Sequence, residues 1–267
     1  MTSSDWKEKS RNYVKRLSKS LMGKTEFELP NISIKKPEVL IRDLSRIPKE
    51  NWWKYAFSRE PMNGRFSDAQ RMDFYLSALE CGKQQADKIF EIYGDIKPEE
   101  LAQKLNLKVE YPQMPQAKSR ILFAEFAEPN TVRVYKDGLE KGALINKSET
   151  MPKWLPEGTE IKDILIAHEL YHVLEQRDKS IWSESYRISL WKIGPVENKS
   201  PIAVLSEIAA MAFAERMNHL NFSAYLLDAF LVYGYSAKAA SALYDEMIAA
   251  AKESQSFEQE SLQAVSV

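Results

Sequence analysis

The chain of 267 residues has a mass of 30.8 kDa, which is enough for one large domain or two small ones. Its composition, 44% hydrophobic and 28% charged, is typical of a globular protein and excludes a wholly disordered one. The single cysteine, Cys81, excludes a disulfide within the chain and a cysteine-rich zinc site. With nine glycines and twelve prolines, the composition favours helices over a turn-rich β-sandwich or barrel.

The sequence contains no pattern typical of a signal peptide or a membrane span. The first seven residues lack the apolar core of a signal peptide. The longest apolar stretch, residues 222–237, contains Asp228 and is shorter than the roughly 18 residues that a membrane span needs. We therefore expect a cytoplasmic protein with no membrane partner.

The net charge of −1 is unevenly distributed along the chain. Residues 1–50 contain twelve lysines and arginines but only seven acidic residues. We interpret the basic arm, residues 1–24, as a solvated amphipathic helix, because this excess is well short of a nucleic-acid footprint. We therefore do not expect the protein to bind nucleic acid directly.

The first 80 residues predict a helical N-terminal extension. Residues 6–21 have a helical pattern rich in lysine and arginine, and residues 68–93 have apolar side chains at helical spacing. The stretch between them, residues 30–61, is marked by prolines. It contains four clustered aromatic residues that we expect to anchor the core of a small lobe: Trp52, Trp53, Tyr55 and Phe57.

Short strands are predicted after residue 95, where the pattern changes. A short helix over residues 96–105 comes first, and Val132 and Val134 then alternate with polar residues. Three strand candidates follow this helix: residues 107–111, 121–127 and 131–135. The last two are close enough to form a β-hairpin, and from about residue 158 the chain is expected to be helical again.

Together these elements predict an α+β fold that is mainly helical and contains a small three-stranded sheet. We expect the main domain to cover residues 81–252. The helical extension, residues 1–80, precedes it, and a polar stretch, residues 253–267, is expected to form a flexible tail.

The clearest chemical signal is His168-Glu169-Leu170-Tyr171-His172, which holds two of the three histidines in the chain. In a helix, the spacing of four residues places both imidazoles on one face, where they can bind one metal ion. Glu169 lies about 100° further round, so it is placed to reach a water bound to that ion. The alternative is a pair of ordinary helical histidines with an incidental glutamate.

The helix that carries this pattern is expected to begin near Thr159. Thr159 follows Gly158 and can act as the cap, and Glu160 and Asp163 place negative charge in the first turn. Apolar residues at helical spacing form a stripe that we expect to be buried: Ile164, Ala167, Leu170, Tyr171 and Leu174.

A zinc ion held by two histidines needs a third protein ligand, for which a carboxylate is the expected type. The remaining histidine, His219, is isolated in the sequence. Glu207 is the best candidate, because it is the only charge in an apolar helix that is expected to begin at Ser200-Pro201. We expect its carboxylate to be deeply buried, which is costly unless the group is paired or binds a metal.

Three other acids compete with Glu207 for the role of third ligand. Glu175 lies one turn beyond His172 on the same helix face, and we expect it to orient an imidazole. Glu184 and Glu197 lie in a polar connection, where an exposed acid needs no functional explanation.

The predicted hairpin, the His168–His172 pattern and the helix Glu207-x-x-Ala210-x-x-Phe213-Ala214 together resemble the ImmA/IrrE family of zinc metallo-endopeptidases. Residues 96–111 are also similar to the opening of that family's domain, and the resemblance covers residues 85–220. It implies a zincin-like fold with Zn²⁺ as cofactor. By this resemblance, His168, His172 and Glu207 would be the metal ligands and Glu169 the catalytic base.

The chain departs from the family pattern at three places. Tyr171 stands where a glycine is usual, and we expect this to narrow the active-site cleft. Ala209 replaces an acid that commonly precedes the alanine. The proline that usually follows Phe213-Ala214 is missing.

The function implied by the resemblance is hydrolysis of peptide bonds in a protein substrate, such as a helix-turn-helix repressor. We expect the substrate to lie extended along the sheet, against residues 121–127 or 131–135. Four residues are candidates for the oxyanion donor: His219, Tyr171, Tyr186 and Tyr225. The alternatives are a non-catalytic zinc-containing regulator, against which Glu169 argues, and a DNA-associated protein, for which a second basic recognition helix is missing.

Overall fold

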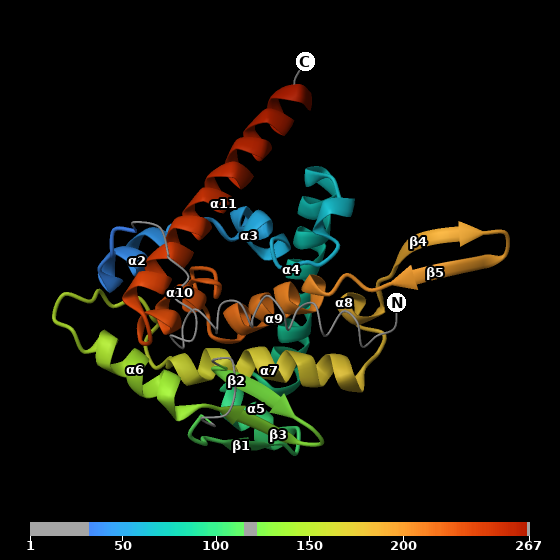
Figure 1. Ribbon diagram of the computed structural model, residues 1–267. Helices are drawn as coiled ribbons and strands as arrows, with labels where there is room; N and C mark the ends of the chain where they lie inside the picture. The colour runs from blue at the N-terminus through green and yellow to red at the C-terminus, as the bar shows by residue number, and fades with distance from the viewer. Residues whose placement is uncertain (1–31, 115–121, 266–267) are drawn as a thin grey trace.

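The computed structural model describes residues 32–114 and 122–265, and it is mostly helical (Figure 1). Within these residues, ten α-helices accompany a three-stranded mixed sheet and a two-stranded hairpin, which confirms the predicted α+β class. None of the described helices is long and apolar enough to cross a membrane. The basic arm, residues 1–24, lies outside the described part of the chain.

The described elements follow one another along the chain with mostly short connections. The helices are α2 (Pro37–Leu44), α3 (Trp53–Phe57), α4 (Asp68–Tyr93), α5 (Pro98–Lys104), α6 (Lys136–Asn146), α7 (Ile161–Arg177), α8 (Trp182–Ser185), α9 (Val204–Met217), α10 (Leu226–Tyr233) and α11 (Ala237–Val265). The strands are β1 (Lys108–Glu110), β2 (Ala124–Ala127), β3 (Thr131–Val134), β4 (Ile188–Ile193) and β5 (Val196–Ser200). Short 3₁₀ helices, Lys49–Trp52 and Asn63–Arg65, flank α3.

The three-stranded sheet has the order β1-β3-β2, so β3 is central and β2 is an edge strand. β2 and β3 pair antiparallel with Phe126 opposite Val132, which confirms the predicted hairpin, and β1 runs parallel to β3. Val132 and Val134 are fully buried, because alternate residues of the central strand face the helix above it.

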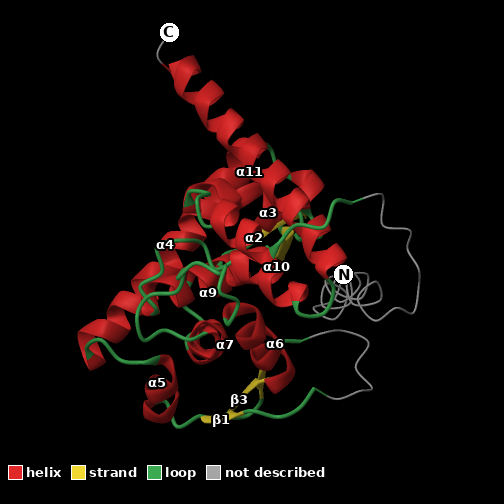
Figure 2. Cartoon of the chain, turned by 90° about the vertical axis from the view of Figure 1, so that its left-hand side faces the viewer, coloured by secondary structure: helices red, strands yellow, loops and turns green. Residues whose placement is uncertain are grey.

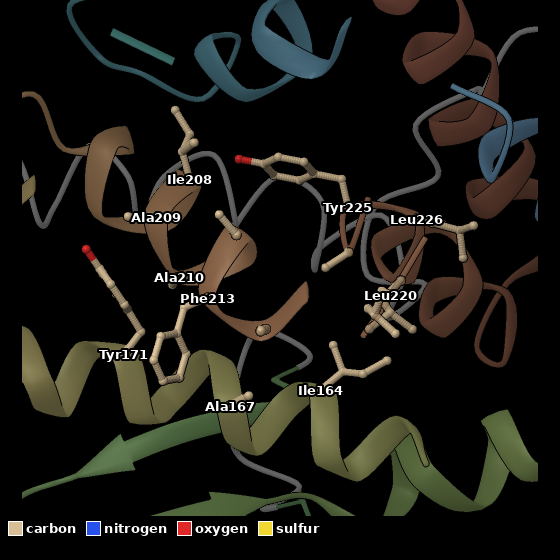
Figure 3. Close-up of a cluster of buried hydrophobic side chains, with 14 of the residues drawn as sticks. Ile164, Ala167, Tyr171, Ile208, Ala209, Ala210, Phe213, Leu220, Tyr225 and Leu226 are labelled. Carbon is tan, nitrogen blue, oxygen red and sulfur yellow. The ribbon is translucent and has the colours of Figure 1, made fainter. Parts of the chain in front are cut away.

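Three layers stack on this sheet. Helix α7 packs on β2 and β3, α9 packs on α7, and α4 packs on α9 (Figures 1 and 2). Figure 3 shows the apolar contact between α7 and α9, in which Ala167 and Tyr171 face Phe213. At Gly82, a β-carbon would lie 2.1 Å from the carbonyl oxygen of Ala209, so only glycine permits α4 to approach α9 this closely.

Residues 188–200, in a region expected to consist of helices joined by a polar connection, form the β4–β5 hairpin instead. Its strands are joined at Gly194, whose φ of +58° suits glycine in a tight turn, and Pro195 follows. The hairpin extends away from the helices (Figure 1), and its side chains Trp191, Ile193 and Val196 are exposed. Local strand pairing and a glycine turn therefore give regular structure to a segment that was expected only to connect two helices.

Both helices of the expected metal site begin differently from the prediction. Helix α7 starts after Glu160 rather than Thr159, and the Glu160 N–H donates to Asp163 Oδ2 at 2.8 Å. Helix α9 starts at Val204, because Ser200 still belongs to β5. Its first N–H, that of Val204, donates to Glu60 Oε2 at 3.0 Å, so a distant carboxylate caps this helix.

The segment before α4 belongs to the same hydrophobic core as α7 and α9. Each of its four clustered aromatic side chains is at most 1% exposed, as expected of core anchors: Trp52, Trp53, Tyr55 and Phe57. The ring of Trp52 stacks on that of Tyr225, with 5.8 Å between centroids. The expected domain boundary between residues 80 and 81 falls inside α4. The stretch expected to form a flexible tail from residue 253 is instead part of helix α11, which runs to Val265.

An ion pair between a partly buried lysine and a buried glutamate joins this segment to α9. Lys49 Nζ lies 2.9 Å from Glu215 Oε2 and also donates to the carbonyl oxygen of Leu220. The other Glu215 oxygen accepts from the Ser223 hydroxyl and the Ala224 N–H. Burial raises the pKa of Glu215 above its ordinary value, although Lys49 and these two donors lower it. The ionised form of Glu215 in the folded protein therefore depends on Lys49 for stabilisation.

We expect Lys49→Met to lower the free energy of unfolding by about 3 kcal/mol at pH 7, because it leaves the Glu215 carboxylate buried without a cation. The loss should shrink toward pH 4.5. The substitution removes the cation that lowers the pKa of Glu215, so this pKa rises further above its value in the unfolded chain. A carboxyl group whose pKa is higher in the folded protein destabilises that protein only where it must ionise, so the loss of stability appears as the pH rises through the folded-state pKa. Urea unfolding at both pH values measures this difference.

The matched control is Lys199→Met, because Lys199 pairs with Glu197 on the exposed hairpin and its side chain is 57% exposed. Its cost should stay below about 1 kcal/mol. A loss for Lys49→Met that is equal at pH 7 and pH 4.5 would show that the charge of Glu215 is not its cause.

Candidate metal centre

Helix α7 brings His168 and His172 together, as their spacing predicts. Their Nε2 atoms lie 3.2 Å apart, and the rings meet edge to face. The two side chains are 15% and 23% exposed, so both are partly covered while their Nε2 atoms face the same space. One ion can therefore meet both imidazoles.

Helix α9 supplies the third member of the group, Glu207. Its Oε2 lies 3.4 Å from His168 Nε2, and its Oε1 lies 3.6 Å from His172 Nε2. All three ligand atoms lie within 4.8 Å of one another. His168, His172 and Glu207 thus form a candidate metal-binding group.

The spacing of these atoms suits a tetrahedral ion. Bonds of about 2.0–2.1 Å to nitrogen and oxygen place neighbouring ligand atoms of a tetrahedral zinc roughly 3.3 Å apart. The two imidazole nitrogens, 3.2 Å apart, and the pair His168 Nε2 and Glu207 Oε2, 3.4 Å apart, lie close to that value, and the other Glu207 oxygen lies 3.6 Å from His172 Nε2. Two imidazoles and one carboxylate are also the donor set of catalytic zinc sites, which keep the fourth position for water.

Glu207 is not deeply buried, contrary to the expectation from its apolar helix. Its side chain is 55% exposed. Helix α9 packs against α7 on one side and α4 on the other, and position 207 faces the side that neither covers. The candidate metal group is therefore open to solvent, which leaves room for a water and a substrate.

Opposite charges stabilise one another within the group. Desolvation lowers the pKa of His172, but the hydrogen bond with Glu175 and the charges of Glu207 and Glu169 outweigh it and raise that pKa to about 9. Desolvation raises the pKa of Glu207, but His168 and His172 outweigh it and bring that pKa down to about 2. Metal binding at His172 would therefore compete with protonation of this imidazole.

Glu169 is turned toward the sheet rather than toward the three grouped atoms. Its Oε2 accepts a hydrogen bond of 2.8 Å from the backbone N–H of Phe126 on the edge strand β2. This N–H therefore points away from β3 and toward α7. The carboxylate that was expected to act as the base therefore contacts the edge strand of the sheet, and it is not a member of the candidate metal group.

Glu175 lies where the sequence predicts, on the far side of the His172 ring. Its Oε2 is 3.4 Å from His172 Nδ1, and its side chain is nearly buried. Ser206, which the sequence reasoning did not consider, also reaches this nitrogen, with its Oγ 3.1 Å away. Its position next to Glu207 is the one signal in the sequence that points to it.

The other candidates for the third ligand lie elsewhere. Glu184 pairs with Lys179, and Glu197 pairs with Lys199, both as partly exposed ion pairs. His219 has a positive φ of 51° and bonds through Nε2 to Asp95 Oδ1 at 2.8 Å. Among the described residues, the structure thus groups only Glu207 with the two histidines of α7.

Tyr171 does not narrow a cleft, contrary to the expectation. It is fully buried, and its hydroxyl lies 2.6 Å from Ser183 Oγ between α7 and α9 (Figure 3). Tyr225 is also buried in the core, and Tyr186 packs on Trp182. Two of the four candidate oxyanion donors, Tyr171 and Tyr225, are therefore core residues.

These observations define a candidate metal group by geometry alone. Comparison with family models, with curated proteins and with solved structures finds no match to this chain.

Proposed function

We propose that this protein is a zinc-dependent endopeptidase of the ImmA/IrrE type. The observation that carries the proposal is the meeting of His168, His172 and Glu207 at separations suited to tetrahedral zinc. Glu169, beside this group, supplies the base that a purely structural metal site does not need.

The proposed reaction is hydrolysis of an amide bond. When bound, zinc supplies a Lewis acid for the carbonyl oxygen and lowers the pKa of water toward about 7. Glu169 takes a proton from the attacking water on its carboxylate oxygen and delivers it to the leaving amine. The N–H of Phe126 holds this carboxylate in the free protein, and therefore orients it between the metal group and the substrate.

The substrate of the proposed enzyme is an extended protein segment that lies along β2. Of the two strands that the sequence left open, β3 is central and fully paired, whereas β2 has a free edge. The N–H of Phe126 points out from that edge and donates to Glu169 in the free protein, so a strand added along this edge would lie directly beside the Glu169 carboxylate. A helix-turn-helix repressor is the substrate class that the resemblance implies.

Metal analysis combined with peptide cleavage tests the proposal. The purified protein should hold about one zinc per chain and cleave members of a peptide library. Removal of zinc with a chelator should stop cleavage, and added zinc should restore it. Zinc without any cleavage would instead support a non-catalytic regulator, and a salt-dependent DNA shift would support a DNA-associated protein.

A further inference from the structure

We propose that Ser206 and Glu175 set the tautomer of His172, and that Tyr171 acts as a positioning residue that holds this pair through Ser183. The inference rests on the proposed metal site. It concerns a buried group of polar side chains behind His172, away from the side that faces His168 and Glu207.

The two nitrogens of His172 face different surroundings. Nε2 points toward His168 and Glu207, so its lone pair must be free if it is to bind a metal. Nδ1 then carries the proton. It lies 3.1 Å from Ser206 Oγ and 3.4 Å from Glu175 Oε2, so both oxygens are within reach of that N–H.

The Glu175 carboxylate accepts its hydrogen bonds, and the neighbouring hydroxyls donate them. The Ser206 hydroxyl donates to Glu175 Oε2, which leaves the Ser206 oxygen free to accept from His172 Nδ1. The Ser183 hydroxyl donates to Glu175 Oε1 at 2.5 Å. Since Ser183 has only one proton, the Tyr171 hydroxyl, 2.6 Å away, must donate to it.

Two of these hydroxyls, those of Ser206 and Ser183, donate to one buried carboxylate, that of Glu175. The Glu175 residue is 5% exposed and Ser183 is 4% exposed, and Tyr171 is fully buried. A buried carboxylate held by two hydroxyls is fixed in position and orientation, because each bond costs more to break where water cannot replace it. Cys81 Sγ lies 3.4 Å from the Tyr171 oxygen at the far end of the chain of bonds.

The packing of α9 on α7 places both Glu207 and Ser206 next to His172. Tyr171 and Glu175 lie one turn apart on the face of α7 that packs against α9. Ser206 precedes Glu207 on α9, so the same turn that brings a ligand to the metal group also brings a hydroxyl to the back of His172. Tyr171 stands where the similar family usually has a glycine, which has no hydroxyl to contribute.

Zinc affinity, measured by competition with a chromophoric chelator, tests the proposal. Ser206→Ala and Glu175→Gln should each weaken zinc binding by about 10- to 100-fold. Tyr171→Phe keeps the buried ring and removes only the hydroxyl, so it should fold normally and weaken zinc binding by a smaller factor. Ser206→Thr retains a hydroxyl and should restore most of the affinity.

Two controls separate positioning from general destabilisation. Ser241→Ala removes a fully buried hydroxyl elsewhere, which accepts from the Lys35 N–H, and should leave zinc affinity unchanged. In the zinc-loaded protein, nitrogen NMR of His172 should show a protonated Nδ1 whose hydrogen exchanges slowly. In Ser206→Ala, this hydrogen should exchange faster, which a purely structural role would not cause.

The outcomes distinguish this inference from the proposed function. If the parent binds zinc but Ser206→Ala, Glu175→Gln and Tyr171→Phe bind it equally well, the positioning role is wrong and the zinc site stands. If the parent binds no zinc, the proposed function fails and the inference fails with it.

Discussion

Glu169→Gln should lower peptide hydrolysis by about 10²- to 10⁴-fold while the zinc content stays at the parent level. Glutamine has the shape of glutamate and keeps an oxygen that can accept from the Phe126 N–H, so the side chain remains in place. It cannot take a proton from water at neutral pH. Only the proton transfer is lost, and kcat should therefore fall far more than KM changes.

The control for this prediction is Glu184→Gln, because Glu184 pairs with Lys179 at the surface. That variant should cleave peptides at the parent rate. The comparison is made on metal-replete proteins, with zinc measured in the same samples. Rapid turnover by Glu169→Gln would refute the role assigned to Glu169 and leave the metal group unaffected.

The second large effect is expected at Glu207, where Glu207→Ala should weaken zinc binding by more than about 100-fold. Losing a direct ligand costs more than the 10- to 100-fold that follows from losing a residue which orients a ligand. The two histidines remain in α7, but two imidazoles alone leave half of a tetrahedral ion without protein ligands. Competition with a chelator measures the loss.

Other acids provide the comparison for Glu207→Ala. Glu184→Ala and Glu197→Ala should bind zinc like the parent, since both side chains form surface ion pairs. Full zinc affinity in Glu207→Ala, together with a loss in one of these two variants, would overturn the choice of the third residue.

The members of the metal group could be predicted because their signals are local. His168 and His172 need only one helix to come together, and Glu175 follows from the same periodicity. Glu207 required one further step, the recognition of a lone charge in an apolar helix. Its exposure could not be predicted, because the sequence does not show which side of α9 stays uncovered by α4 and α7.

In the fold too, elements formed by neighbouring residues could be predicted, whereas contacts between residues far apart in the sequence could not. The β2–β3 hairpin could be predicted from alternation and a short connection. The β4–β5 hairpin was not predicted, although Gly194-Pro195 marks its turn, because the polar segment was interpreted as a connection between two helices. The cap of α9 could not be predicted at all, since Glu60 and Val204 are 144 residues apart.

Residues 49–60 contact both ends of α9, and this has a consequence for the order of folding. Glu60 binds the first turn of that helix, and Lys49 reaches Glu215 and Leu220 at its other end. These contacts span 144 and about 170 residues, so closing them is entropically costly and slow.

During synthesis, residues 49–60 must therefore wait until residue 220 has emerged before α9 can be locked in place. His168 and His172 can meet as soon as their helix forms, whereas Glu207 can join them only after α9 has emerged and packed on α7. The third ligand of the proposed metal site thus arrives after the two histidines, and a nascent chain should retain metal only weakly until α9 is in place.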